Sequence, residues 1–180
     1  MSCLCNSSPW HFQLIGVRGA TRSWLTDQGS LTRRIIAHCP LFSVRHLRQH
    51  SDLTDRDEAA MCGLAGSPRV MLREVFLYCG DTPVVFAHSV LPYTSLRGAW
   101  TKLGKLGNRP LGAALFANPC VRRAPLAYKR LSPRHSLYQR ACARLGQRPP
   151  YLWARRSLFA LHGRRILVTE VFLPTLLELT

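Results

Sequence analysis

The sequence predicts an α+β domain built on an antiparallel sheet. Residues 70–92 and 154–174 each contain two apolar, β-rich runs separated by turn residues, the pattern of a β-hairpin. Short helical segments accompany the hairpins, without the regular strand-helix alternation that builds a parallel sheet. The 180 residues have the length of one domain, which can bury roughly 70 % of its unfolded surface. We therefore expect one domain over residues 1–180, with 1–22 as a partly ordered arm.

The C-terminal hairpin carries one isolated charge. Its turn is predicted at residues 162–164, between two strands within residues 154–174. Because successive side chains of a strand point to opposite faces, Glu170 shares a face with Ile166, Val168 and Phe172. An ionised carboxylate among apolar side chains must be paired, hydrogen-bonded or neutralised. Glu170 is therefore a candidate site residue, although an ordinary structural ion pair explains the pattern as well.

The first hairpin, residues 70–92, contains two adjacent charges in an apolar strand. Arg73 and Glu74 must lie on opposite faces of the sheet. If Arg73 faces the core, its planar guanidinium requires a carboxylate or an anionic ligand. The alternative, in which Arg73 extends to solvent and Glu74 is the buried charge, fits the pattern equally well.

Two predicted helix starts offer backbone donors for an anion. Ser30 is suited to cap a helix that ends before Pro40, and Pro110 is suited to begin a second short helix. The first N–H groups of a helix have no acceptor within the helix and lie at the positive end of its dipole. The N–H groups that follow Ser30, and those near Leu111, are therefore candidate carboxylate contacts.

The remaining elements are less regular. We expect a strand over residues 41–47, and a short helix after Thr54 with a capping box completed by Asp57. Inward-facing residues of the helix after Ser30 are predicted to be Leu31, Ile35 and Ile36. Leu96, Trp100 and Leu103 are predicted to share one face of a helix that ends at Gly107 and Asn108.

Composition limits the class of protein. The chain has 25 Lys and Arg against 9 Asp and Glu, a formal charge of +16, which attracts anions from nucleic acids to small polycarboxylates. Seven scattered cysteines without a C-x-x-C pair predict free thiols in a reducing cytoplasm. No window reaches the roughly 18 continuous apolar residues of a membrane span, so no stable membrane insertion is expected. No signal peptide is recognisable, which agrees with a cytoplasmic location.

Residues 122–148 form the most basic segment of the chain, with arginines interleaved with two tyrosines and several prolines. Such a segment is usually a solvated surface, but it can also cover a pocket or follow a phosphate backbone. Elsewhere there is no phosphate-binding glycine loop, dinucleotide fingerprint, nucleophile elbow or metal-binding histidine pair. Any catalysis is therefore expected to need neither a metal nor an organic cofactor.

Several blocks of sequence, taken together, resemble the chorismate lyase family. They are Trp24-Leu25, Ser30 to Arg34, Leu72-Arg-Glu-Val75, Leu106-Gly-Asn-Arg-Pro-Leu-Gly112, Leu115-Phe116, Trp153-Ala-Arg-Arg-Ser157 and Leu167 to Pro174. These blocks occur in order over residues 24–174, which makes the resemblance more specific than any one of them. Two departures are that the family position at Leu31 can be methionine, and that the basic segment is longer than in another member.

The resemblance implies a fold and a set of site residues. The fold is an antiparallel sheet with helices packed on it and helical flaps over a buried pocket. The family's arginine and glutamate fall at Arg73 and Glu170, and its two backbone contacts fall at Leu31 and Leu111. The implied activity is the cofactor-free conversion of chorismate to 4-hydroxybenzoate and pyruvate at the first committed step of ubiquinone synthesis, with product inhibition. A transient contact with the membrane prenyltransferase that consumes the product would follow.

Two other classes of protein remain open. The same fold occurs in effector-binding domains of bacterial transcription regulators, which bind small carboxylates without converting them. A chain of this length has no room for a separate DNA-reading domain, and both Arg73 and Glu170 would then need another purpose. A nucleic-acid binder is supported only by the net charge and by residues 122–148.

Overall fold

A computed structural model describes residues 9–179, apart from the side chains of residues 46 and 47. The α-helices are α1 (Gly19–Thr26), α2 (Leu31–His38), α3 (Arg56–Cys62), α4 (Tyr93–Leu96), α5 (Leu111–Ala117) and α6 (Ser136–Ala141). The strands are β1 (Phe42–Leu53), β2 (Arg69–Cys79), β3 (Thr82–Leu91), β4 (Arg122–Arg123), β5 (Ala127–Leu131), β6 (Leu152–Leu161) and β7 (Arg164–Phe172). Short 3-10 helices are η1 (Thr101–Lys105), η2 (Cys142–Arg144) and η3 (Pro174–Glu178).

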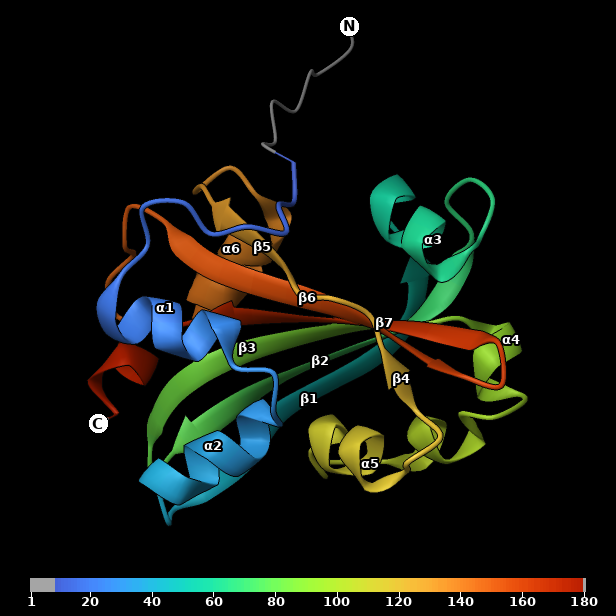
Figure 1. The fold of residues 1–180 in the computed structure, drawn as a ribbon, viewed down its shortest axis with the longest axis horizontal. Helices are drawn as coiled ribbons and strands as arrows, with labels where there is room; N and C mark the ends of the chain where they lie inside the picture. The colour runs from blue at the N-terminus through green and yellow to red at the C-terminus, as the bar shows by residue number, and fades with distance from the viewer. Residues whose placement is uncertain (1–8, 180) are drawn as a thin grey trace, which may run out of the picture.

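One antiparallel sheet contains all these strands, in the order β1-β2-β3-β7-β6-β4, with β5 also paired to β6. The two predicted hairpins are its central part, because β3 of the first hairpin pairs with β7 of the second. Helices α2 and α5 cover one face, and α3 and α6 lie over the other (Figure 1). The predicted α+β architecture, an antiparallel sheet with helices packed on it, is confirmed.

Both hairpin turns follow from local sequence. His162 and Gly163 have φ angles of 47° and 75°, so the turn between β6 and β7 needs two left-handed residues. Such turns match the natural twist of paired strands, and glycine adopts this conformation without steric cost. A tight turn at Gly80 and Asp81 joins β2 to β3, so the predicted hairpin within residues 70–92 is confirmed.

The core lies on both faces of the sheet. On the face under α2 and α5, buried side chains include Leu31, Ile35, Val75, Leu111 and Leu115. The opposite face is filled by Phe76, Phe86, Tyr138, Val171 and Leu173. Alternate residues of β2 therefore enter different core layers, which explains why β2 is apolar nearly throughout.

Three details of the helix predictions are wrong. Ile36 is 46 % exposed, because α2 presents only the side carrying Leu31 and Ile35 to the sheet. The capping box after Thr54 does not form; the Thr54 hydroxyl donates instead to Glu58. Residues 96–103 form the end of α4 and the start of η1 rather than one helix.

Tertiary hydrogen bonds explain the break between α4 and η1. The indole N–H of Trp100 donates to the Arg164 carbonyl at 2.9 Å, and the Ser95 hydroxyl donates to the Arg165 carbonyl at 2.8 Å. Gly98 lies between these anchors, and glycine costs about 1 kcal/mol in a helix interior relative to alanine. The β6–β7 turn thus determines the local conformation where the apolar spacing alone predicted a helix.

The predicted N-terminal arm packs against the sheet where the structure describes it. His11 exchanges backbone hydrogen bonds of 2.9 and 2.7 Å with Tyr128 on β5. Trp10 lies under the guanidinium of Arg156, with 4.3 Å from the Arg156 Cζ to the ring centre. The part of the predicted arm at residues 1–8 lies outside the described residues.

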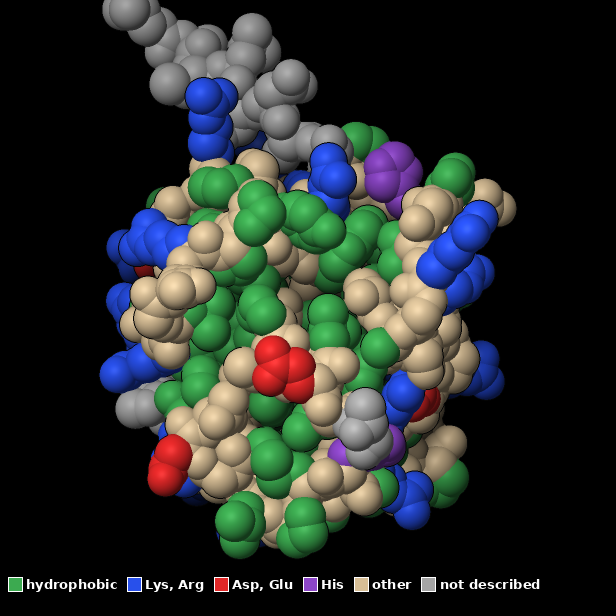
Figure 2. Space-filling view, turned by 90° about the vertical axis from the view of Figure 1, so that its left-hand side faces the viewer, with side chains coloured by type: hydrophobic (Ala, Val, Ile, Leu, Met, Phe, Trp, Pro, Cys, Tyr) green, Lys and Arg blue, Asp and Glu red, His purple; other side chains and the backbone are tan. Residues whose placement is uncertain are grey.

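The surface reflects the net charge. Figure 2 shows Lys and Arg side chains around the margin of one face, with hydrophobic side chains nearer its centre. The basic segment 122–148 is more ordered than a solvated tail, since it contains β4, β5, α6 and η2. No helix within residues 9–179 is long and apolar enough to cross a membrane.

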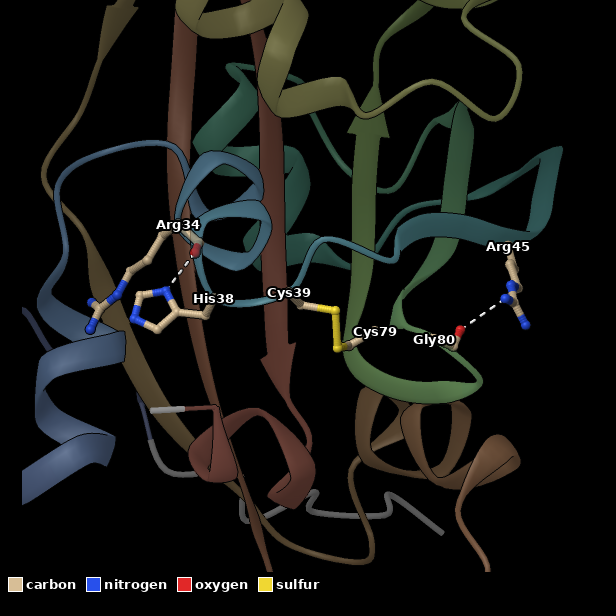
Figure 3. The surroundings of a disulfide bond; sticks show 6 residues. All are labelled: Arg34, His38, Cys39, Arg45, Cys79 and Gly80. Carbon is tan, nitrogen blue, oxygen red and sulfur yellow. Dashed lines mark hydrogen bonds between the residues drawn. A yellow bond between two sulfur atoms is a disulfide. The ribbon is translucent and has the colours of Figure 1, made fainter.

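The prediction that all cysteines are free thiols is wrong. Cys39 and Cys79 form a disulfide with 5.8 Å between their Cα atoms (Figure 3). Cys39 follows α2 and Cys79 ends β2, so the bond ties the covering helix to the sheet. Sequence spacing could not show this pair, because the fold brings together residues 40 positions apart. Cys62, Cys120 and Cys142 are free, whereas Cys3 and Cys5 lie outside the described residues.

Candidate active site

A cavity lies between the sheet and the two helices α2 and α5. Its floor is formed by β2, β3, β6 and β7, and its walls by the starts of both helices and by β4. All four predicted site residues, Leu31, Arg73, Leu111 and Glu170, line it. Other lining residues are Gly29, Thr32, Val75, Leu77, Ala87, Ser89, Pro110, Gly112, Leu115, Phe116, Arg123, Ser157, Phe159 and Val168.

Sheet register places Arg73 and Glu170 on the same face. Arg73 pairs with Ser89 on β3, and Glu170 pairs with Ala87, two positions away along the same strand. Since Arg73 and Glu170 are two strands apart and two residues out of register, their Cα atoms lie roughly 12 Å apart. The two side chains thus reach the same cavity from strands that are not neighbours.

Arg73 is a buried cation that has no carboxylate partner within the described part of the chain. Its side chain is 1 % exposed, and its Nη2 donates to the backbone carbonyls of Gly107 and Arg109 at 3.1 and 2.9 Å. Its Nε has no hydrogen-bond partner among the described residues. Burial lowers the pKa of Arg73 to about 10, so the guanidinium stays charged at neutral pH. The sequence left open whether Arg73 or Glu74 is the buried charge. Both are buried, on opposite faces of the sheet.

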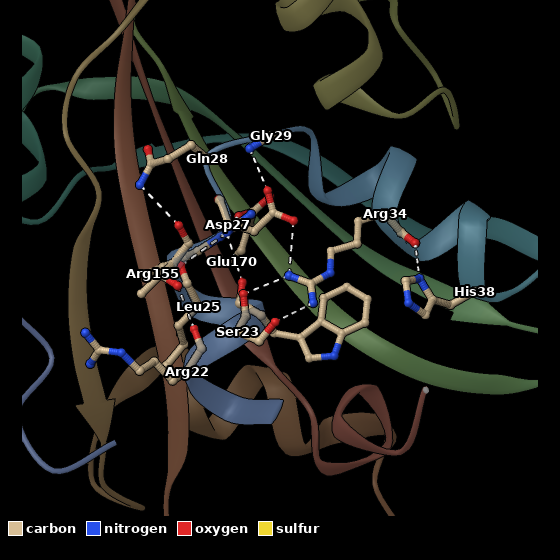
Figure 4. A network of polar contacts seen from close by, with 12 residues as sticks. Arg22, Ser23, Leu25, Asp27, Gln28, Gly29, Arg34, His38, Arg155 and Glu170 are labelled. Carbon is tan, nitrogen blue, oxygen red and sulfur yellow. Dashed lines mark hydrogen bonds and ion pairs between the residues drawn. The ribbon is translucent and has the colours of Figure 1, made fainter. Parts of the chain in front are cut away.

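Glu170 is held by an arginine that the sequence analysis did not single out. The Nε of Arg155 donates to Glu170 Oε2 at 2.6 Å, and the two residues are direct neighbours on β6 and β7 (Figure 4). The Arg155 side chain is fully buried, whereas the Glu170 side chain is 19 % exposed. Glu170 is therefore both part of an ion pair and accessible to a ligand in the cavity.

Arg155 also fixes the end of α1. Its Nη1 donates to the carbonyls of Trp24, Leu25 and Asp27, at 3.1, 3.2 and 2.8 Å. The last carbonyls of a helix have no partner within it, and a cation there complements the negative end of the helix dipole. The sequence did hold a signal, because Arg155 lies opposite Glu170 once the second hairpin is closed about its turn.

The two helix starts meet above the cavity. Ser30 caps α2 as predicted, since its hydroxyl accepts from the Arg33 N–H at 3.4 Å. Pro110 is the residue before α5 rather than its first residue. A Cβ on Gly112 would lie 3.2 Å from Thr32 Oγ1, so a larger residue here would require the Thr32 side chain to shift, whereas glycine fits the close approach of α5 to α2. The N-terminal ends of both helices, including Leu31 and Leu111, thereby reach the same cavity.

A third arginine borders the cavity and was not predicted. Arg123 on β4 pairs with Phe159 on β6, and both line the cavity. Its Nη1 donates to the Gln28 carbonyl at 2.9 Å. Burial lowers the pKa of Arg123, while the nearby carboxylate of Glu170 acts to raise it. The sequence analysis treated Arg123 only as one charge in the basic segment.

A second ionic cluster lies away from the cavity on the other face of the sheet. His88 is 2 % exposed, with Nδ1 3.0 Å from Glu74 Oε1 and Nε2 3.4 Å from Glu58 Oε1. Arg140 on α6 pairs with the same Glu74 oxygen at 3.2 Å. These groups neutralise one another and join α3 and α6 to the sheet.

Comparison with known proteins identifies the family. The model of the family described as chorismate lyase matches residues 10–178. The chain belongs to the chorismate lyase family. A protein of Nitrosospira multiformis named probable chorismate pyruvate-lyase is 50 % identical over 173 residues, covering 96 % of each chain. One of the same name from Aromatoleum aromaticum is 54 % identical over 160 residues, covering 88 % of this chain and 86 % of its own.

Solved structures show where else this chorismate lyase fold occurs. The effector domain of PhnF from Mycobacterium smegmatis has a TM-score of 0.59 and 15 % identity, covering 83 % of this chain and 91 % of that one. A transcriptional regulator of the GntR family from Bacillus cereus has a TM-score of 0.54 and 12 % identity, covering 75 % and 93 %. At such low identity the likeness concerns the fold alone.

Proposed function

We propose that this enzyme of the chorismate lyase family converts chorismate to 4-hydroxybenzoate and pyruvate without a cofactor. The observation that carries the proposal is Arg73, a buried cation in the cavity with no carboxylate partner among residues 9–179. Breaking or omitting the partner of a buried charge is costly, so such an arginine is suited to an anionic ligand. Glu170 lines the same cavity two strands away from Arg73 and supplies a hydrogen-bond acceptor there.

The substrate has functional groups that match these positions. Chorismate carries a ring carboxylate, and a hydroxyl on the ring carbon opposite to it. We propose that Arg73 and the N–H groups of Leu31 and Leu111 bind the ring carboxylate, because these groups line one cavity. Glu170 would then accept a hydrogen bond from the ring hydroxyl, while Arg155 holds the carboxylate of Glu170 in place.

The reaction requires little covalent help. The C–H bond at the hydroxyl-bearing carbon breaks, and its electron pair completes the aromatic ring. The neighbouring C–O bond of the enolpyruvyl ether breaks in the same elimination, and the electron pair leaves with the ether oxygen. The enolpyruvate formed takes a proton at its methylene carbon and becomes pyruvate. We assign to the protein the tasks of orienting the ether, excluding water and assisting proton transfer at Glu170.

Access to the cavity requires movement of its cover. The cavity volume is about 40 Å³, whereas a cavity that binds benzene measures about 150 Å³. Helices α2 and α5 are the elements whose separation would enlarge it, since they form the wall opposite the sheet. We propose that they act as the flaps expected from the family resemblance. A closed cover would also retain the aromatic product, so we expect product inhibition.

The biological setting stays a prediction. We propose a role in ubiquinone synthesis, with the product passing to a membrane prenyltransferase through a transient contact. A cytoplasmic location also stays a prediction. It was based partly on the expectation that all cysteines are free thiols, and the Cys39–Cys79 disulfide weakens that argument.

The deciding experiment is the incubation of purified protein with chorismate, with 4-hydroxybenzoate and pyruvate measured by chromatography. We expect equal amounts of both products, and a loss of kcat/KM of at least about 100-fold in Arg73→Met, because a buried ionic contact is removed. Arg69→Met is the matched control, since Arg69 is an exposed arginine on the same strand and the same side. It should keep the wild-type rate.

The outcomes distinguish the two classes of ligand-binding protein. Absence of turnover, with saturable binding of 4-hydroxybenzoate that needs Arg73, would contradict the lyase and favour an effector-binding domain. Turnover that Arg73→Met and Arg69→Met change equally would contradict the assigned role of Arg73.

A further inference from the structure

Arg123 is a cavity residue for which ring-carboxylate binding offers no role. It lies on β4, which is the edge strand beside β6, whereas Arg73 lies on β2, one strand in from the opposite edge. Its direct cross-strand neighbour is Phe159, which lines the cavity with it. The guanidinium carbon lies 5.4 Å from the Phe159 ring centre and 5.5 Å from that of Phe116. These two rings hold the guanidinium at the cavity wall.

The charge of Arg123 is not neutralised by the described residues. Its Nη1 is hydrogen-bonded to the carbonyls of Gln28 and Gly29, at 2.9 and 3.5 Å. Its Nε is buried and has no hydrogen-bond partner in the described part of the chain. A buried, unpaired guanidinium nitrogen beside a cavity is a donor available to an anion.

The charge balance of the cavity indicates the kind of anion. Glu170 is already paired with Arg155 at 2.6 Å, so this pair contributes no net charge. Arg73 and Arg123 remain, each without an ion-pair partner among residues 9–179. Two separated positive charges in one cavity match a ligand with two separated carboxylates better than a monoacid.

We propose that Arg123 binds the second carboxylate of the substrate, the one on the enolpyruvyl group; this inference rests on the proposed function. Arg123 and Glu170 both lie on strands next to β6, where their cross-strand neighbours are Phe159 and Arg155, whereas Arg73 lies on β2, on the other side of β3 and β7. The enolpyruvyl ether is attached to the ring carbon next to the hydroxyl-bearing carbon that Glu170 is proposed to bind. The carboxylate of that ether therefore extends to one side of the line that joins Arg73 to Glu170, and β4 with Arg123 borders the cavity on the side of β7 away from β2.

This contact has a consequence for the reaction cycle. Arg123 touches only the part of the substrate that leaves as pyruvate, whereas Arg73 touches the part that stays in the aromatic product. Arg123 fixes the orientation of the C–O bond that breaks, and keeps the negative charge of the departing enolpyruvate compensated. Once pyruvate has left, 4-hydroxybenzoate has no contact with Arg123.

The test compares the binding of two acids to Arg123→Met. The monocarboxylate probe is 4-hydroxybenzoate, and the dicarboxylate probe is 3-(carboxymethoxy)-4-hydroxybenzoate, which carries a second carboxylate on an ether next to the hydroxyl. Calorimetric titration should show dicarboxylate binding weakened about 10- to 100-fold, the range expected for a lost charge-assisted hydrogen bond. Binding of 4-hydroxybenzoate should change less than about twofold. Arg123→Lys should recover part of the loss, because it restores the charge without the planar fork.

Arg122→Met is the matched control. Arg122 is the adjacent residue of β4, is exposed and points to the other face of the sheet. Its substitution therefore removes the same charge without changing the lining of the cavity. It should leave both affinities unchanged. Equal weakening of both acids by Arg123→Met would overturn the proposal, since it would show that Arg123 acts through the contact to Gln28. Unchanged affinity for both acids would overturn it as well.

These measurements do not depend on turnover. If wild-type protein failed to convert chorismate but showed the selective loss of dicarboxylate binding, the lyase would be contradicted and the second subsite retained. If chorismate were converted but the loss were not selective, only the role of Arg123 would be contradicted.

Discussion

Three arginines and one glutamate account for the chemistry around the cavity, and each arginine has a different partner. Arg73 and Arg123 donate to backbone carbonyls and keep donors for a ligand. Arg155 instead gives its Nε to Glu170 and its Nη1 to the end of α1. Arg155 is thus a positioning residue, because it contacts the proposed ligand only through Glu170.

Removal of Arg155 should be costly to the fold. Arg155→Met leaves Glu170 without its partner and three carbonyls near the end of α1 without a donor, so we expect a loss of about 3–5 kcal/mol of unfolding free energy. Urea unfolding of Arg155→Met, Glu170→Gln and the double variant measures this. The double variant should be more stable than the sum of the two single losses predicts, because the unpaired carboxylate is gone.

A control and an activity measurement separate stability from positioning. Arg134→Met changes an exposed arginine and should be within about 0.5 kcal/mol of wild type. Where Arg155→Met remains folded, its kcat for chorismate should fall while the amount of folded protein does not. Additive losses in the double variant would show that Arg155 and Glu170 are not energetically coupled.

His88 gives the protein a pH-dependent contribution to stability. Burial alone lowers the pKa of His88, but the adjacent carboxylates of Glu58 and Glu74 outweigh this and raise the pKa above its usual value; Arg140 acts against them. The charged imidazolium is therefore favoured in the folded state. Its contribution is fully present below the unfolded pKa of about 6.5 and is lost as pH rises through the higher folded pKa.

The matching measurement is the unfolding free energy of wild type minus that of His88→Gln as a function of pH. Between pH 6 and 9 this difference should fall, by at most about 1.4 kcal/mol per pH unit. The cluster lies on the face opposite the cavity, so the KM of His88→Gln for chorismate should stay close to that of wild type. A difference that grows with pH would mean that His88 is neutral in the folded protein.

At the scale of elements, the disulfide controls the position of α2. It links Cys39, directly after α2, to Cys79 at the end of β2, whereas the other end of α2 forms the cavity wall at Leu31. Reduction should release this end of the helix from the sheet. Closing a loop of this length restricts the unfolded chain by up to about 4 kcal/mol, so that much stability can be lost.

Thermal unfolding and kinetics with and without reductant test this prediction. Reduced wild type and Cys39→Ala should both unfold at lower temperature and show a higher KM for chorismate, because α2 no longer holds Leu31 and Thr32 against the cavity. Cys120→Ala, at an exposed free cysteine, is the control and should behave as wild type does. Unchanged unfolding temperature and KM on reduction would show that α2 does not depend on the bond.

The elements that the sequence predicted well are those determined by local rules. Alternation and turn residues defined both hairpins, and a serine cap defined the start of α2. The segment around Trp100 was predicted as one helix, and this prediction was wrong. Its conformation depends on the hydrogen bond from Trp100 to the Arg164 carbonyl, in a turn over 60 residues away. Long-range contacts of this kind leave no mark on local periodicity.

The same distinction applies to the cavity. Arg73 and Glu170 were recognisable as isolated charges in apolar strands, and both line the cavity. Arg123 gave no such signal, because it lies among other arginines, and only the pairing of β4 with β6 directs it inward. Strand order, rather than strand sequence, therefore determined which member of the basic segment reached the site.

At the scale of the whole molecule, the net charge of +16 should act on the rate at which anionic ligands bind. Electrostatic attraction accelerates association by about 10- to 1,000-fold at low salt, and salt screens it over a Debye length of about 10 Å at 0.1 M. The slope of the logarithm of the rate against ionic strength depends on the charge of the ligand. A dicarboxylate should therefore show a steeper slope than a monocarboxylate.

Stopped-flow binding between 10 and 300 mM KCl tests this prediction. The association rate of 3-(carboxymethoxy)-4-hydroxybenzoate should fall about tenfold over this range, and that of 4-hydroxybenzoate by about half as much on a logarithmic scale. The kcat for chorismate should not change, because the bound groups are enclosed and poorly screened. A mixed-sequence oligonucleotide serves as the polyanion control: if it competed with chorismate at physiological salt, the basic surface would have a nucleic-acid partner. Equal salt slopes for the two acids would show that the charge of the molecule does not steer its ligand.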